Sequence, residues 1–435
     1  MLTDNPTINL ETMIVLSYNN QDCFYHNSGI WEIMDTYIAR QPIFDRKKHL
    51  FAYELLFRDG LSNCFPEIDG DTATSKVLSS SFLSIGIESI TGGKRAFINF
   101  TQNLLTSEIP FMFPKQSTVV EILEDVNPVP EVIETCKKLS AEGYYLALDD
   151  FFFEAAMLSL VKLVNIIKID FRATPIDKIK NLISNPQLAG IKLLAEKIET
   201  NEEFKNARDL GFAYFQGYFF SEPEIIKGKE LAGSTLQLLN LIIEINKPEV
   251  NLEKLEKIIE HDVSITYKLL RYVNSASIKR RAEISSIRKA VMIIGLDELK
   301  RLTSLISLSK VSVDKPDELI KSSCIKARFC EKLGQESTSS TKYNEIFLIG
   351  LFAHIDAILD QPMKDIMEKI PISKTISDAL INGEGEAVKY LRLAECYERG
   401  EWNDVKQYAA QTSVDESVIP GIYIEACKWA DEFSS

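Results

Sequence analysis

The sequence predicts an α/β fold, a closed (β/α)8-type, TIM-like barrel, followed by an all-α domain. In the first half, short runs rich in Val, Ile, Leu and Phe alternate with helix-like stretches. Continuous apolar strands separated by helices indicate a parallel sheet covered on both faces, and this many units in about 200 residues favour a closed barrel. From about residue 231 onward the apolar periodicity is helical. We therefore expect a barrel over residues 34–235 and a helical domain over 236–435.

The barrel strands are predicted by the apolar runs in chain order. The first, TYIAR, begins shortly after Met34, which we favour as the true start over a loosely ordered extension of residues 1–33. The later runs are AFINF at 96–100, TVVEIL at 118–123, YYLALDD at 144–150, VNIIKID at 164–170 and IKLLAEK at 191–197. Helices are expected between them, at 130–143 and 200–211. The alternation ends with YFQGYFFSEP at 214–223.

The helical domain is predicted from apolar residues at three- and four-residue spacing. Helices are expected over 234–246, 252–260, 264–274, 286–308 and 345–359. Asp262 and Ser286 stand where helix N-caps belong, and Gly295 interrupts one helical pattern in the manner of a turn.

Composition limits the classes of function. A formal net charge of -14 and a pI near 5.0 argue against binding to long nucleic acids, and the basic run at 277–289 is interpreted as a solvated helix face. The 7 cysteines are an odd number without CxxC spacing, which is typical of reduced thiols. Because no apolar run reaches the length of a membrane helix, we expect a cytoplasmic protein without membrane contact.

A set of polar residues at or near the ends of successive apolar runs carries the chemistry. Strand ends meet at one rim of a barrel, so these side chains should form a single acidic cup. Carboxylate and amide oxygens suit Mg²⁺ or Mn²⁺, and two such ions about 3.5–4 Å apart can promote attack of water on a phosphodiester. The alternative is that each acid caps a helix or faces solvent. The set comprises Glu54, Asn99, Glu121, Asp149, Asp150, Lys168, Glu196 and Gln216.

The same residues resemble the motifs of the EAL family of cyclic di-GMP phosphodiesterases, in the same order along the chain. ELLFR at 54–58 is similar to the family's E-x-L-x-R signature, and INFT at 98–101 carries its asparagine. EILE at 121–124, DDF at 149–151, KID at 168–170, AEKIET at 195–200 and QGY at 216–218 match the remaining steps.

This resemblance implies hydrolysis of cyclic di-GMP to linear pGpG with two Mg²⁺ or Mn²⁺ ions. It implies metal ligation by Glu54, Asn99, Glu121, Asp149 and Asp150. Lys168 and Glu196 would position the attacking water, so that they and Glu54 are the catalytic residues. Arg58 would contact substrate phosphate and Gln216 would line the pocket. Glu124, Glu199 and Asp170 would support the ligands from behind.

The sequence departs from the family pattern around these motifs. After the DDF motif the family carries a glycine-rich G-T-G-Y loop, whereas this chain has Phe152, Phe153 and Glu154, which cannot adopt glycine's positive-φ conformations as readily. Leu123 replaces a common threonine, and Lys197 replaces a glycine. These departures leave open a second hypothesis, in which the barrel is a cyclic di-GMP receptor or signalling adaptor.

The second half resembles the HDOD domain over most of residues 236–420, from HDVSITYKLLRYVNSASI at 261–278 and IFLIGLFAHIDAILDQPM at 346–363. The resemblance implies a regulatory or interaction module with an unidentified protein partner, and the barrel family makes a homodimer a candidate assembly. A metal site at His261 is not expected, because such a site needs several histidines and this half has only His261 and His354. We interpret His354 as a core residue on an apolar helix, and Cys324 and Cys330 as core thiols.

Overall fold

A computed structural model describes residues 37–58, 87–149, 157–222 and 231–434, apart from residues 89, 108, 261, 275–285, 313–314 and 338–342. Several predictions concern residues outside this set: Met34, Asp150, the loop at 151–154, His261 and most of the basic run at 277–289.

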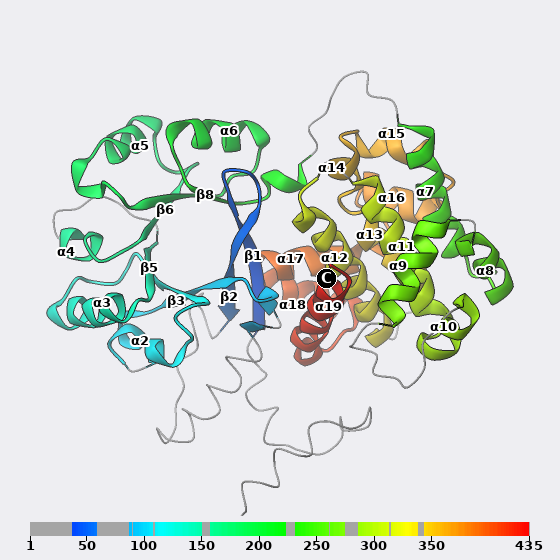
Figure 1. The fold of residues 1–435 in the computed structure, drawn as a ribbon, viewed down its shortest axis with the longest axis horizontal. Coiled ribbons are helices and arrows are strands. Elements are labelled where there is room, and N and C mark those ends of the chain that lie inside the picture. Colours follow the sequence, from blue (N-terminus) through cyan, green and yellow to red (C-terminus); the bar gives the residue numbers. More distant parts are fainter. Residues whose placement is uncertain are drawn as a thin grey trace, which may run out of the picture.

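Eight strands form a closed barrel in chain order, which confirms the predicted fold (Figure 1). The strands are β1 (Tyr37–Asp45), β2 (Leu50–Arg58), β3 (Arg95–Phe100), β4 (Thr118–Ile122), β5 (Tyr145–Leu148), β6 (Ile166–Asp170), β7 (Lys192–Glu196) and β8 (Tyr214–Gln216). From β2 to β8 neighbouring strands are parallel.

The expectation of a wholly parallel sheet is wrong for β1, which runs antiparallel to both β2 and β8. A tight turn joins β1 to β2, with Lys48 in the left-handed region at φ 62° and its backbone N–H donating to the Asp45 carbonyl at 3.0 Å. So short a connection permits only an antiparallel pair, because parallel strands need a crossover.

Short helices lie on the outside of the barrel: α2 (Gln102–Thr106), α3 (Pro130–Glu142), α4 (Leu158–Val161), α5 (Ile176–Ile183) and α6 (Asn201–Leu210). The helices predicted at 130–143 and 200–211 are confirmed. Thr200 and Glu203 form a reciprocal capping box at the start of α6, and Gly211 ends it at φ 105°.

The helical half extends from α7 to α19. Its helices are α7 (Gly233–Ile245), α8 (Leu252–Glu260), α9 (Val263–Val273), α10 (Ile287–Ile294), α11 (Leu296–Val311), α12 (Asp317–Glu336), α13 (Tyr343–Phe352), α14 (Ile355–Leu359), α15 (Met363–Met367), α16 (Lys374–Ile381), α17 (Val388–Arg399), α18 (Trp402–Thr412) and α19 (Ile419–Ser434). Among the described residues, none of the helices combines the length and apolarity needed to span a bilayer.

The predicted helix boundaries of this half are confirmed at three residues. Asp262 caps α9 by accepting from the Ser264 and Ile265 backbone N–H groups, Ser286 caps α10, and Gly295 at φ 85° separates α10 from α11. The single helix expected over 345–359 is instead broken into α13 and α14 by a turn at 353–354. His354 therefore lies in this turn and not within an apolar helix, whereas Cys324 and Cys330 are buried free thiols as predicted.

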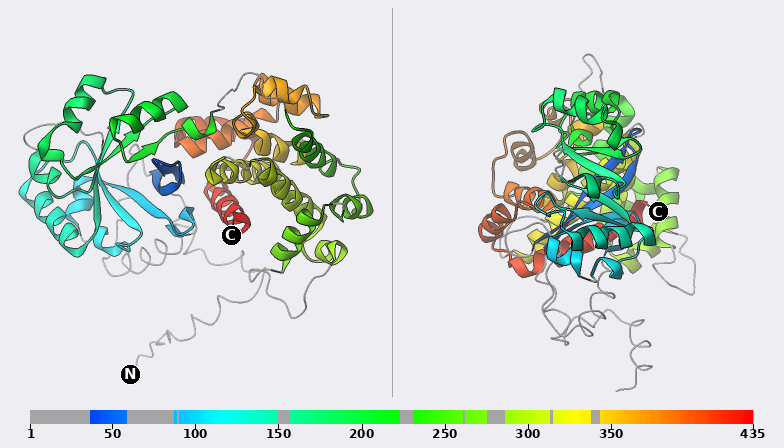
Figure 2. Two further views of the ribbon diagram at one scale, coloured as in Figure 1. Left: turned by 45° about the horizontal axis from the view of Figure 1, so that its top comes forward. Right: turned by 90° about the vertical axis from the view of Figure 1, so that its left-hand side faces the viewer.

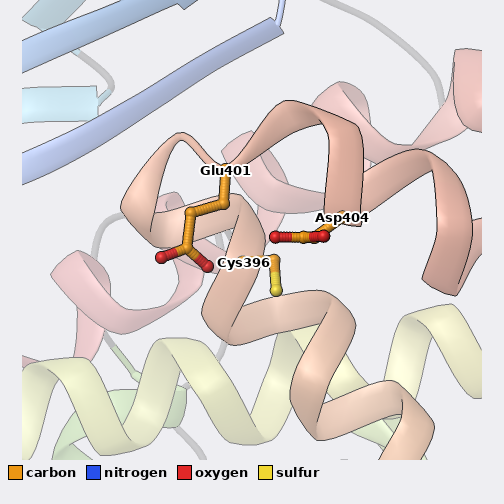
Figure 3. A group of neighbouring side chains, drawn as sticks. All are labelled: Cys396, Glu401 and Asp404. Carbon is orange, nitrogen blue, oxygen red and sulfur yellow. The ribbon is translucent and has the colours of Figure 1, made fainter.

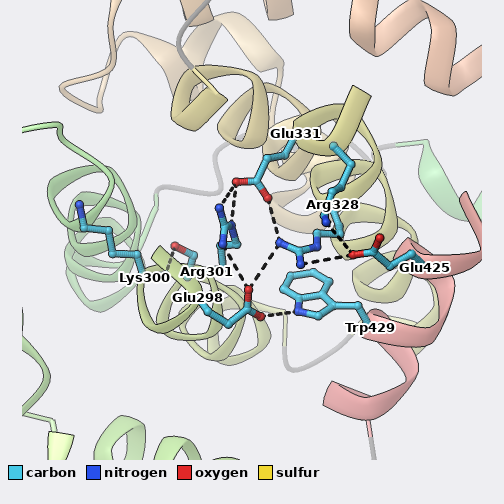
Figure 4. A network of polar contacts seen from close by, with 9 residues as sticks. Glu298, Lys300, Arg301, Arg328, Glu331, Glu425 and Trp429 are labelled. Atoms are coloured by element: carbon cyan, nitrogen blue, oxygen red, sulfur yellow. Dashed lines mark hydrogen bonds and ion pairs between the residues drawn. The ribbon is translucent and has the colours of Figure 1, made fainter. Parts of the chain in front are cut away.

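A polar network ties three helices of this half together (Figure 4). Arg301 of α11 donates from Nε to Glu331 of α12 at 2.7 Å, and Arg328 of α12 donates to the same carboxylate at 3.1 Å. From α19, the Trp429 indole N–H donates to Glu298 at 2.6 Å. The buried Glu331 carboxylate is thereby paired where α11 and α12 meet, as a buried charge requires.

The two halves meet on the β1 and β2 side of the barrel, which faces α12, α17 and α19 (Figures 1 and 2). The Tyr53 hydroxyl of β2 donates to the buried Glu318 carboxylate of α12 at 2.8 Å, and the Arg40 guanidinium lies 4.3 Å from the centre of the Tyr53 ring. The Tyr397 hydroxyl of α17 donates to the Ile38 carbonyl at 3.3 Å. One continuous apolar core runs through this contact.

Candidate active site

The site is a polar layer inside the barrel, lying directly above an apolar one. Side chains alternate along a strand, so every second residue points inward. The apolar layer consists of Ile43, Ala52, Phe97, Val119, Ala147, Ile166 and Leu194. Two residues further toward the rim on each strand stand Gln41, Glu54, Asn99, Glu121, Asp149, Lys168 and Glu196, and Gln216 stands two residues after Tyr214. We call these eight residues the carboxylate cup.

Lys168 lies at the centre of the cup and contacts four carboxylates. Its ammonium is 2.8 Å from Glu196, 3.1 Å from Asp149 and 3.3 Å from Glu54, and it also pairs with Glu121. These five groups carry four formal negative charges and one positive charge. The cup therefore keeps a net negative charge that a cation can neutralise.

Amide side chains hold Glu54 from both sides. Asn99 donates to one carboxylate oxygen at 3.1 Å, and Gln216 donates to the other at 2.7 Å. The Gln216 amide also donates to Gln41 at 3.0 Å. Gln41 is a member of the cup that was not predicted from the sequence. Its signal is the register of β1, in which Gln41 pairs directly with Glu54.

Burial and mutual repulsion perturb the acids of the cup. Burial raises the pKa of Glu121 well above its usual value, against the effect of Lys168, and nearby Glu54 and Asp149 raise it further. The same causes raise the pKa of Glu196 to about 8. Burial alone would lower the pKa of Lys168, but the surrounding carboxylates raise it well above its ordinary value. Perturbed groups of this kind concentrate at functional sites.

The oxygen atoms of the cup are suitable ligands for divalent cations. Asn99 Oδ1, Glu121 Oε2 and Gln216 Oε1 are buried oxygens without a hydrogen-bond partner among the described residues. Such acceptors are costly unless a donor or a cation satisfies them. Oxygen ligands alone suit Mg²⁺, Mn²⁺ or Ca²⁺ and not zinc or copper.

The remaining predicted site residues lie around the cup. Asp170 accepts from the backbone N–H groups of Arg172 and Ala173 and from the Lys197 ammonium, so it shapes the loop after β6. Glu199 pairs with Arg172 at 2.5 Å. Glu124 is exposed on the turn after β4. Arg58 ends β2, and its side chain, like Asp150, is outside the described part of the structure.

Lys197 occupies a backbone position that favours glycine. It has φ 56°, in the left-handed region, directly after Glu196. This explains why a glycine is expected there. The Lys197 ammonium donates to Asp170 at 2.6 Å, so its charge is shared with that carboxylate.

A cavity of about 1080 Å³ opens above the cup. Its barrel side includes Glu54, Glu196 and Gln216, and its opposite side is formed by residues 399–406 of the helical half. This second wall was not predicted, because nothing local in the sequence indicates a contact between segments so far apart. The volume is slightly above the roughly 300–1,000 Å³ typical of small-molecule sites.

A closed barrel that presents these carboxylates, asparagine and lysine from successive strands is an EAL-type domain. The EAL domain family model matches residues 76–223, and the HDOD domain model matches residues 235–376. Cyclic di-GMP phosphodiesterase CdgJ of Vibrio cholerae is 38% identical over 402 residues, covering 92% of this chain and 93% of CdgJ. The chain belongs to the family of EAL–HDOD proteins that includes CdgJ.

Other relatives extend the comparison. The uncharacterized protein YuxH of Bacillus subtilis is 37% identical over 404 residues, covering 91% of this chain and 98% of YuxH. Among solved structures, the EAL enzyme Bd1971 with cAMP and cyclic di-GMP bound matches with a TM-score of 0.35 and 17% identity, over 45% of this chain and 63% of that one. An EAL domain protein from Listeria monocytogenes matches with a TM-score of 0.33 and 19% identity, over 44% and 91%.

Proposed function

We propose that this chain is a cyclic di-GMP phosphodiesterase that adds water across one 3′,5′ phosphodiester to give linear pGpG, using two divalent cations, Mg²⁺ or Mn²⁺, held in the carboxylate cup. The observation that carries the proposal is the group of four carboxylates around Lys168, two of which line a large cavity, together with buried oxygens that have no hydrogen-bond partner among the described residues. We assign hydrolysis to residues 34–235 and regulation or interaction to the HDOD half, 236–435.

The side chains of the cup would have different roles in hydrolysis. Glu54, Asn99, Glu121 and Asp149, with Asp150, would hold the cations, which supply charge to stabilise both the attacking and the leaving oxygen. Glu196 and Lys168, whose Oε1 and Nζ atoms are 2.8 Å apart, would position the attacking water. Asn99 and Gln216 fix the orientation of Glu54.

The test is turnover of cyclic di-GMP by the purified full chain with Mg²⁺ and with Mn²⁺, followed by chromatographic detection of pGpG. We expect Glu54→Ala to lower kcat at least about 100-fold, because it removes a ligand contacted by Asn99, Lys168 and Gln216. Its circular dichroism should remain that of the wild type. Glu134→Ala is the matched control, since Glu134 is exposed on α3, outside the cup.

Normal turnover by Glu54→Ala would refute the metal assignment. Saturable binding of cyclic di-GMP without any product from the wild type would instead place this chain among receptors.

A further inference from the structure

The cavity above the cup has one wall that the barrel does not supply. The turn between α17 and α18, together with the first residues of α18, places Arg399, Glu401, Trp402, Asp404 and Lys406 on the cavity opposite Glu54 and Glu196. We call this segment, residues 399–406, the α17–α18 turn. It lies beyond the span matched by the HDOD model, which ends at residue 376.

The α17–α18 turn is fixed against the barrel. Gly400 ends α17 in the left-handed region at φ 71°, and a Cβ added there would lie 3.0 Å from the Leu56 Cδ1 atom of β2. One turn earlier, Tyr397 donates to the Ile38 carbonyl of β1 at 3.3 Å. The Trp402 ring packs edge-on against Tyr397, with ring centroids 5.3 Å apart. The cavity wall therefore has a defined position relative to the cup.

The turn carries groups that suit a guanine base. Trp402 is only partly buried and lines the cavity, so it offers an indole on which a base can stack. Glu401 and Asp404 offer carboxylates, which accept hydrogen bonds. Guanine presents two neighbouring donors, N1–H and the 2-amino group, whereas adenine has no donor at either position.

These two carboxylates lie close to the Cys396 thiol (Figure 3). Burial and the hydrogen bond to Glu401 raise the pKa of Cys396 to about 12, so the thiol is protonated and is a poor metal ligand. The thiol instead forms a hydrogen bond with Glu401, and both carboxylates line the cavity.

We propose that the α17–α18 turn completes the substrate pocket, with Trp402 stacking on one guanine of cyclic di-GMP and Asp404 accepting from its N1–H and 2-amino groups. This inference rests on the proposed function, in which one phosphate of the dinucleotide lies at the cup. The same cavity is lined by Glu54 and Glu196 of the cup and by the turn, so we infer that a base attached to that phosphate reaches the turn.

The first test is steady-state hydrolysis of cyclic di-GMP by the full chain and three variants. Trp402→Ala should raise KM at least about fivefold with kcat within about twofold, because stacking stabilises ground state and transition state alike. Trp402→Phe should restore part of the affinity. Gln407→Ala, an exposed residue of α18 outside the cavity, should leave KM unchanged.

The second test measures binding and base selectivity without turnover. With Ca²⁺ in place of Mg²⁺, cyclic di-GMP should quench tryptophan fluorescence in the wild type and in Trp429→Phe, but not in Trp402→Phe. Cyclic di-AMP should compete weakly with the wild type. Asp404→Asn should reduce the preference for the guanine dinucleotide at least about fivefold, which a purely structural role of Asp404 would not do.

The outcomes separate the two proposals. If the wild type hydrolyses cyclic di-GMP while KM, quenching and selectivity are unchanged in the variants, the phosphodiesterase stands and the role of the turn is refuted. If the wild type binds cyclic di-GMP with Trp402-dependent quenching but forms no pGpG, the turn stands and the hydrolytic proposal fails. Absence of any binding to the wild type overturns both. Should Trp402→Ala fail to fold, the role of the turn is tested by the KM of Trp402→Phe and by comparing fluorescence quenching in Trp402→Phe and Trp429→Phe.

Discussion

At the scale of single residues, the cup is a site whose charge is incompletely balanced by protein groups. Lys168 contacts four carboxylates, and burial together with like charges raises the pKa values of Glu121 and Glu196. A folded chain that gathers acids in this way loses stability unless cations enter, because the carboxylates repel one another at low local dielectric.

We therefore predict that divalent cations stabilise the protein. Saturating Mg²⁺ or Mn²⁺ should raise Tm by about 3–8 °C over the value in EDTA, because each ion binds the folded state preferentially. Differential scanning fluorimetry measures the shift. Glu121→Gln should reduce it by more than half, whereas the exposed Glu134→Ala should not. An equal shift in Glu121→Gln would show that the cations bind elsewhere.

Gly217, directly after Gln216, is a second residue on which the geometry of the site depends. It has φ 138°, and an added Cβ would lie 2.1 Å from the Ile198 carbonyl oxygen. Backbone hydrogen bonds join Ile198 to Gln216 and Phe219 at this point, close to Glu196. The close approach explains the glycine of the Q-G-Y motif.

Gly217→Ala should therefore cost about 2–4 kcal/mol of unfolding free energy and most of the activity, because the backbone beside Glu196 must shift. Urea unfolding monitored by circular dichroism gives the first quantity, and turnover the second. Gly143→Ala is the control. Its φ is 91°, but no atom lies within 4 Å of the added Cβ, so only the cost of the left-handed backbone, about 1 kcal/mol, is expected. Equal losses in the two variants would contradict the steric argument.

At the scale of elements, α12 and α13 cross so closely that a side chain at their contact is excluded. Gly350 of α13 faces the α12 backbone, where an added Cβ would lie 2.6 Å from the Lys326 carbonyl oxygen and 2.7 Å from Ala327 Cα. Helix propensity favours alanine over glycine by about 1 kcal/mol, so propensity and packing oppose each other here.

We predict that the steric cost of packing exceeds the gain in helix propensity. Gly350→Ala should lower the unfolding free energy by about 2–3 kcal/mol, because two helix backbones have to separate. Gly421→Ala, in α19 with no atom within 4 Å of the new Cβ, should be neutral or slightly stabilising. Chemical denaturation of both variants tests the pair, and a stabilised Gly350→Ala would refute the close crossing.

Local patterns predict some elements and not others. The capping box at Thr200 and the cap at Asp262 can be recognised from a few neighbouring residues, and α6 and α9 begin directly after them. The direction of β1 does not follow from its apolar residues, which suggested a parallel strand; it follows from the tight turn that joins β1 to β2. The break at 353–354 also escapes prediction, because neither Ala353 nor His354 is a residue that interrupts helices.

The same distinction applies to the site. The strand-end position of its acids predicts the cup, and two-residue alternation places an apolar residue beneath each member. Gln41 could have been found from strand register once β1 was known to be antiparallel. The α17–α18 turn could not, since its contact with the cup depends on the tertiary packing of α17 against β1.

At the scale of the whole molecule, the barrel and the helical half share one apolar core and a buried polar contact at Tyr53 and Glu318. Tyr53→Phe removes the hydroxyl that donates to this buried carboxylate, so we expect it to lower the unfolding free energy of both halves by about 1–3 kcal/mol. Wild type and variant should each unfold in one transition, seen alike by near- and far-ultraviolet circular dichroism. Tyr145→Phe, a more exposed tyrosine of β5, is the control. Two transitions in the wild type would show that the halves are energetically independent.

The reversed strand β1 also determines when the fold can be completed. Ile43 pairs with Gln216 across the whole length of the barrel sequence, and Ile38 bonds to Tyr397 near the other end of the chain. Contacts between such distant residues require large loops to close, which slows folding. On a ribosome, the first strand must therefore wait for β8 before its second edge is paired, and for α17 before its outer face is covered. During that wait β1 presents an open edge, which favours association with another unfinished chain.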